Sequence, residues 1–107
     1  MSHQYTAELL REALQSRSGI TEKKMFGGIC FLMNGNMLCG TGEDRVMFRV
    51  GKDLEAEAVA RAGAQAMEMG GRKMGGLVWV ELDAAVEAGL DNWISLANKF
   101  VGSLPPK

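Results

Sequence analysis

Histidine is almost absent from this chain, and its scarcity excludes several kinds of active site. His3 is the only histidine, and it lies near a chain end, where residues are often poorly ordered. A Cys-His pair or a Ser-His-Asp triad needs a base that packing holds in place. The two cysteines form no C-x-x-C pair, and one terminal histidine does not complete a four-ligand zinc site. We therefore expect a protein that is not an enzyme and that carries no metal or cofactor.

An excess of charge of either sign is also missing. The formal net charge is −1 at pH 7, and the isoelectric point is about 5.8. A protein that holds the phosphate backbone needs clustered Lys and Arg side chains, and it commonly shows a basic isoelectric point. We therefore do not expect direct binding to nucleic acid.

Long apolar runs are missing as well. No stretch approaches the roughly 20 apolar residues of a membrane-spanning helix. The first residues, MSHQYTAELLR, lack the apolar segment of a secretory signal. Two cysteines in a chain of 107 residues without such a signal are typical of a reducing compartment. We expect a cytoplasmic protein with no membrane contact.

What is present predicts one α+β domain over residues 1–107. Apolar residues make up 47% of the chain, which is enough for a core without disulfides. The pattern predicts a helix over 5–17, strands over 23–33, 36–40 and 45–50, a helix over 54–62, strands over 66–69 and 77–82, a turn over 83–89 and a final helix over 90–104. The order α-β(3)-α-β(2)-α implies a mostly antiparallel sheet.

The two cysteines fall in a predicted hairpin. Asn34-Gly35 favours a two-residue type I′ turn, because both central residues of that turn need a positive φ. Counting outward from the turn places Cys30 directly opposite Cys39, on a rung where the Cα atoms lie about 4.5 Å apart. Such a pair could form a disulfide, as in a thiol redox sensor. We favour buried structural thiols, because free cysteine is among the most buried residue types.

The same register gives the predicted meander two apolar faces. One face carries Cys30, Leu32, Met37, Cys39, Val46 and Phe48. The opposite face carries four further apolar residues, flanked by arginines. A sheet with one wet face should alternate apolar and polar residues, so this second face should be covered by the chain's own helices or by a second copy of the chain. We predict a homodimer whose partner interface consists of Ile29, Phe31, Leu38, Met47 and Arg49.

Basic residues occur close together at two places in the sequence. Lys23 and Lys24 lie in the first predicted strand, and Arg72 and Lys73 lie in the glycine-rich segment 70–76. Together they could contact an anion, which would suit a nucleic-acid-associated accessory protein. We favour the interpretation of residues 70–76 as the solvated tip of a hairpin, because surface loops often carry such charges.

Several short segments form a recognisable pattern, within a match that runs from about residue 5 to residue 106. They are EKKMFGG at 22–28, NGNM at 34–37, FRVG at 48–51, GRKM at 71–74, VWV at 78–80, Trp93 in the final helix and LPP at 104–106. In these segments the chain resembles the N-terminal domain of the TfoX/Sxy competence regulators. The run KMFGG at 24–28 is the most specific part of the resemblance.

The resemblance implies both a fold and a role. The fold is α-β(3)-α-β(2)-α, similar to secretion-chaperone-like domains, many of which dimerise. In the full-length regulators this domain is associated with competence-gene activation alongside the cyclic-AMP receptor protein. Those regulators also have a C-terminal domain of DNA-binding-like character, which we expect this chain, ending at Lys107, to lack. The resemblance supplies no catalytic residues, so we predict a regulatory domain that contacts a second copy or a transcription regulator.

Overall fold

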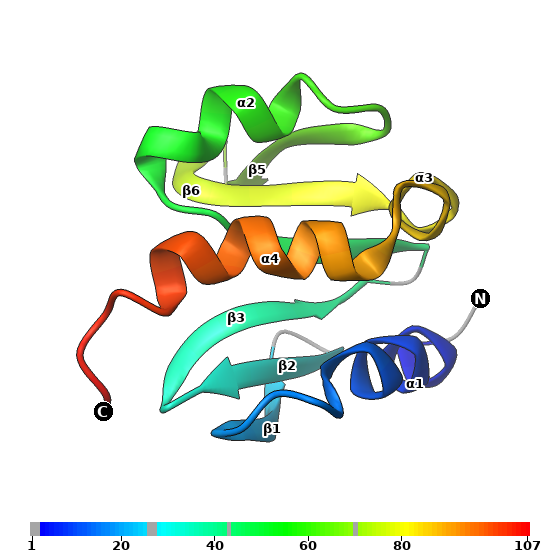
Figure 1. Ribbon diagram of the computed structural model, residues 1–107. Helices are drawn as coiled ribbons and strands as arrows, with labels where there is room; N and C mark the ends of the chain where they lie inside the picture. Colours follow the sequence, from blue (N-terminus) through cyan, green and yellow to red (C-terminus); the bar gives the residue numbers. More distant parts are fainter. Residues whose placement is uncertain (1–2, 26–27, 43, 70) are drawn as a thin grey trace.

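The computed structural model describes residues 3–25, 28–42, 44–69 and 71–107. Its helices and strands confirm the α+β class (Figure 1). In chain order they are α1 (His3–Leu14), β1 (Ile20–Met25), β2 (Gly28–Met33), β3 (Asn36–Thr41), β4 (Arg45–Arg49), a 3-10 helix (Lys52–Leu54), α2 (Glu55–Val59), β5 (Ala64–Met69), β6 (Arg72–Glu81), α3 (Leu82–Ala88) and α4 (Leu90–Val101). Within these ranges, no helix has both the length and the apolar character to cross a bilayer.

The strands form one sheet in the order β1-β2-β3-β4-β6-β5, and all neighbouring strands run antiparallel. The first four follow one another as a meander, and β5 and β6 form a hairpin. The pairing of β4 with β6 joins the two parts, from Arg45 opposite Glu81 to Arg49 opposite Leu77. The whole sheet therefore depends on this one seam for its continuity.

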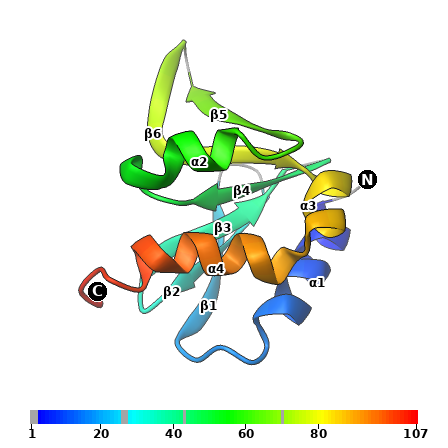
Figure 2. The same ribbon diagram turned by 45° about the horizontal axis from the view of Figure 1, so that its top comes forward.

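The helices pack on one side of this sheet, where they form the main apolar core (Figure 2). Helix α4 crosses the middle of the sheet and contacts β3 and β4, while α1 contacts β2 and β3. Trp93 of α4 is fully buried and stacks on Phe48 of β4, with ring centroids 5.2 Å apart and an interplanar angle of 16°. Stacked aromatic pairs of this kind add to the stability that area burial provides.

The segment predicted as one strand over 23–33 forms two strands instead. Met25 pairs with Gly28, and β1 and β2 run antiparallel from that pair, while Phe26 and Gly27 lie outside the described residues. Strand β1 is at the edge of the sheet, and its residues from Thr21 to Lys24 are exposed. From Thr21 to Lys24 it has no buried apolar face that alternation could have revealed. Its charges protect the open edge from pairing with other chains.

Two further elements differ from the prediction. The glycine-rich segment is largely strand, because Glu68 pairs with Lys73 and Met69 pairs with Arg72, so that β6 begins at Arg72. Residues 83–89, predicted as a turn, belong mainly to helix α3, whose Leu82 and Ala85 are buried one helical turn apart. In both cases contacts with other elements outweigh the weak local preference of the sequence.

The predicted turn at Asn34-Gly35 is confirmed. Both residues have positive φ, 52° and 85°, as a type I′ turn requires, and Met33 pairs with Asn36. The register then shifts: Leu32 pairs with Met37, but Phe31 pairs with Cys39, which leaves Leu38 as an extra residue in β3. Because of this bulge, the consecutive residues Leu38 and Cys39 both face the main core, where both are fully buried.

Candidate functional site

The residues predicted to form a partner interface do not share one face. Phe31 and Leu38 lie in the main core under the helices, with 1% and 0% of their surface exposed. Ile29 is partly buried against that core, whereas Met47 belongs to a separate cluster. The guanidinium of Arg49 lies over the ring of Phe100, 5.3 Å from its centroid. The predicted interface is therefore wrong as a single outer face, because the bulge at Leu38 shifts the register from which it was deduced.

A different apolar face exists on the other side of the sheet. Its cluster contains only strand residues: Cys30, Met37, Met47, Met67, Leu77 and Trp79. Cys30, Met47 and Met67 are almost fully buried, while Met37, Leu77 and Trp79 remain partly exposed. No helix within the described ranges contributes to this cluster. We call these six residues the helix-free face. In the part of the chain that the structure describes, the helices are thus not divided between the two sides, which was the alternative to a second copy.

An arginine lies at the margin of the helix-free face. The guanidinium of Arg45 is 4.0 Å from the ring centroid of Trp79, close enough for a cation–π interaction. Arg45 is exposed and pairs across the strands with Glu81. Tryptophan, arginine and methionine are the residue types that protein interfaces favour at their centres. The face thus combines apolar area with a polar group that can orient a partner.

The two cysteines are free and buried, and they are not directly opposite each other. Cys39 pairs with Phe31 and lies in the main core, while Cys30 pairs with Gly40 and lies in the helix-free face. The predicted opposition is wrong because it assumed a register without the bulge. Burial raises the pKa of both thiols, so neither forms the reactive thiolate readily near neutral pH. These features favour buried structural thiols over a redox sensor.

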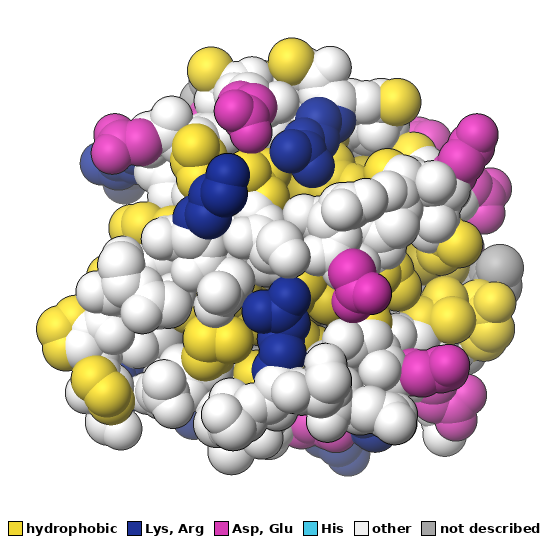
Figure 3. Space-filling view, in the orientation of Figure 1, with side chains coloured by type: hydrophobic (Ala, Val, Ile, Leu, Met, Phe, Trp, Pro, Cys, Tyr) yellow, Lys and Arg dark blue, Asp and Glu magenta, His cyan; other side chains and the backbone are white. Residues whose placement is uncertain are grey.

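The four basic residues predicted to contact an anion do not form one patch. Lys23 and Lys24 are on β1 at one edge of the sheet, and Arg72 begins β6 beside the opposite edge. Three strands lie between, which at about 4.8 Å per strand spacing separates the two groups by roughly 19 Å. The side chain of Lys73 lies outside the described residues. Basic and acidic side chains are interspersed over the face seen in Figure 3.

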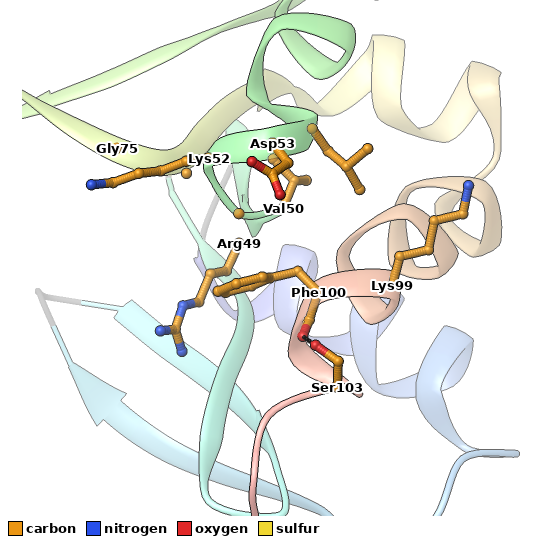
Figure 4. A pocket seen from close by; sticks show the side chains of 11 residues that line it. Arg49, Val50, Lys52, Asp53, Gly75, Lys99, Phe100 and Ser103 are labelled. Carbon is orange, nitrogen blue, oxygen red and sulfur yellow. Dashed lines mark hydrogen bonds between the residues drawn. The ribbon is translucent and has the colours of Figure 1, made fainter.

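A pocket of about 670 Å³ lies where the segment after β4 meets the end of α4 (Figure 4). Asp53 and Phe100 lie on opposite sides of it, and three basic side chains surround it, from Arg49, Lys52 and Lys99. In the described part of the chain, no carboxylate is within ion-pair distance of these three cations. The basic groups are therefore available to a ligand.

The backbone that forms the pocket is held by hydrogen bonds. The amides of Val50 and Gly51 both donate to the carbonyl of Gly76, and the amide of Gly76 donates to Glu55 Oε1 at 2.7 Å. Gly51 has a φ of 82°, and a Cβ built on it would lie 2.6 Å from the ring of Phe100. Only glycine fits at this position, so the segment can pass directly beside the aromatic ring.

Sequence reasoning missed most residues of both surfaces. Met67 and Leu77 belong to the helix-free face. Leu77 could have been found from the alternation along β6, which places it on the same face as Trp79. The pocket residues Lys99 and Phe100 are far from Lys52 in sequence, and no spacing rule connects them. Among the described residues, no group of three or more His, Cys, Asp or Glu could hold a metal ion.

Taken together, these features define a small α+β domain with an antiparallel sheet whose described helices pack on one side. The chain belongs to the TfoX N-terminal domain family, whose model matches residues 12–101 of the 107. The resemblance noted in the sequence is thereby confirmed. This family is not known for an enzymatic activity. Neither the curated proteins nor the solved structures that were compared with the chain give a match.

Proposed function

We propose that this chain is a non-enzymatic regulatory domain that acts through protein contacts made by its helix-free face. The observation that carries the proposal is an apolar sheet surface with no described helix over it. Its partly exposed residues, Met37, Leu77 and Trp79, belong to one cluster, and contiguous exposed apolar surface usually marks a contact with another protein. The partly exposed Trp79, with Arg45 stacked on it, is the natural centre of such a contact.

The partner that we propose is a second copy of the chain. Closed, symmetric homodimers are the commonest assemblies, and in them the same patch of both subunits meets itself. Pairing two helix-free faces would cover Met37, Leu77 and Trp79 of both copies at once. The family suggests a setting in the cytoplasm, in competence-related regulation, and a transcription regulator as a further partner. The two free cysteines are consistent with that compartment.

The oligomeric state tests the proposal directly. We expect the wild-type chain to sediment as a dimer at high micromolar concentration, and Met37→Glu to shift it to monomer, because the new carboxylate would be desolvated in the interface. Val86→Glu is the matched control, since Val86 is 50% exposed on α3, on the side of the helices. A monomeric wild type, or equal loss of dimer in both variants, would refute the homodimer. Circular dichroism checks that each variant is folded.

A further inference from the structure

We propose that the pocket between the segment after β4 and the end of α4 binds small organic anions. The ligand would place a flat apolar body between Leu54 and Phe100, and its acidic group would lie at the basic rim. This site is separate from the helix-free face, so the inference stands independently of the proposed dimer.

The charge around the pocket selects an anion. Arg49, Lys52 and Lys99 contribute three positive charges, and Asp53 contributes one negative charge. The pocket therefore carries an excess of two positive charges, although the chain as a whole has a formal net charge of −1. Because the two lysines are exposed, each cation contributes modestly, and the affinity must come from their sum.

The walls select an apolar body. Phe100 and Leu54 are both partly exposed, so each presents apolar surface to the pocket. Arg49 stacks on the ring of Phe100 and brings positive charge next to the apolar wall. Aromatic walls with a few polar groups are typical of small-molecule sites, whose volumes are about 300–1,000 Å³. The volume of about 670 Å³ falls in this range.

The pocket is formed before any ligand arrives. The hydrogen bonds from Val50 and Gly51 to Gly76, and from Gly76 to Glu55, fix the position of the segment after β4. The close passage of Gly51 beside Phe100 fixes that segment against α4. A preformed site loses little ordering entropy when it binds a small ligand.

The test is a titration of the isotope-labelled chain, followed by the backbone amide shifts of Gly75 and Gly76. The probes are phenyl phosphate and benzoate, with inorganic phosphate and benzyl alcohol as the anion alone and the neutral ring alone. We expect the two aromatic anions to shift both amides saturably, and the tighter of them identifies phosphate or carboxylate as the preferred group. Inorganic phosphate and benzyl alcohol should bind much more weakly. Equal binding by either of these two, or no saturable shift with the aromatic anions, overturns the proposal.

Two charge substitutions should act in opposite directions. Lys99→Gln should weaken phenyl phosphate binding by about 1.5- to 5-fold, and Asp53→Asn should strengthen it by a similar factor, because these are partly exposed charges. The matched control is Lys23→Gln, which removes an exposed lysine on β1 at the edge of the sheet and should change nothing. Weaker binding of phenyl phosphate to Asp53→Asn would show that this carboxylate helps to hold the ligand instead of repelling it, and would overturn the proposal. An equal effect of Lys23→Gln would also overturn it.

Discussion

At the scale of single residues, Trp93 combines ideal packing with an unmet polar group. Its ring is fully buried and stacked on Phe48, and the guanidinium of Arg61 lies 5.0 Å from the ring centroid. Its buried Nε1 has no hydrogen-bond partner in the described part of the molecule. A buried donor without a partner costs about 1–3 kcal/mol, so the residue stabilises the fold by its ring and not by its N–H group.

This contrast predicts different costs for two substitutions. Trp93→Ala should destabilise the fold by about 3–5 kcal/mol, because it leaves a large cavity. Trp93→Phe should cost only about 1–2 kcal/mol, since it keeps an aromatic ring against Phe48 and removes the unpaired donor. Urea unfolding followed by circular dichroism measures both free energies. Equal costs for the two substitutions would contradict the role of the aromatic ring that packs against Phe48.

At the scale of elements, an ion pair joins helix α1 to strand β1. Arg11 donates to both carboxylate oxygens of Glu22, with both distances 2.7 Å. The hydrogen bond from Arg11 lowers the pKa of Glu22. Because this pKa is lower in the folded state, the stabilisation is present above the ordinary glutamate pKa, and it is lost as the pH falls through the folded value.

The pair therefore predicts a pH-dependent effect. Glu22→Gln should lower the free energy of unfolding at pH 7 by a modest amount, because both side chains are largely exposed. The difference from the wild type should shrink as the pH falls below the folded pKa of Glu22, where the wild-type carboxyl is also neutral. Denaturant titrations at several pH values measure this difference in the free energy of unfolding. Glu57→Gln, in the more distant pair with Arg61, at 3.6 Å, is the control and should have a smaller effect. A difference that persists in acid would contradict the role of this carboxylate.

The C-terminal segment is tied to the hairpin of β2 and β3. Asn36 is buried, and its Nδ2 donates to the carbonyl of Pro105 at 2.9 Å. The amide of Lys107 donates to the carbonyl of Asn34 at 2.8 Å. These contacts hold the residues after α4 beside the turn at Asn34-Gly35.

Removing one of these contacts should release the segment. Asn36→Ala should speed hydrogen exchange at the amide of Lys107 and lower the stability by about 0.5–1.5 kcal/mol, the usual contribution of a single hydrogen bond. Asn92→Ala removes a comparable side-chain bond, from Asn92 Nδ2 to the carbonyl of Ala88, and should leave Lys107 unchanged. Unaltered exchange in Asn36→Ala would show that other contacts hold the segment.

Local signals predicted some elements well and could not predict others. The apolar stripe from Leu90 predicts α4, and Asn34-Gly35 predicts its turn, because both signals lie within a few residues. The bulge at Leu38 leaves no local signal, since a β-bulge is stabilised by what the extra residue packs against. That single added residue is enough to place Leu38 and Met47, which were predicted to share a face, on opposite sides of the sheet.

At the scale of the whole molecule, the sequence predicted that an apolar face would need a cover, but not which face. Which face stays uncovered depends on where helices α1 to α4 pack, and contacts between elements distant in sequence determine this packing. The pocket shows the same limit, because Lys52 and Phe100 meet only when α4 returns across the sheet. The net charge of the chain also gave no indication of the pocket, since a chain with a net negative charge can carry a locally basic pocket.

The seam between β4 and β6 also bears on how the chain reaches this structure. Hairpin contacts within residues 20–49 and within residues 64–81 close short loops, whereas the seam must bring residues 45–49 to residues 77–81. Closing the longer loop costs more chain entropy, and such non-local pairing slows folding. The meander and the hairpin can thus form early and separately, and the zipping of β4 to β6 is the event that commits the chain to one cooperative unit.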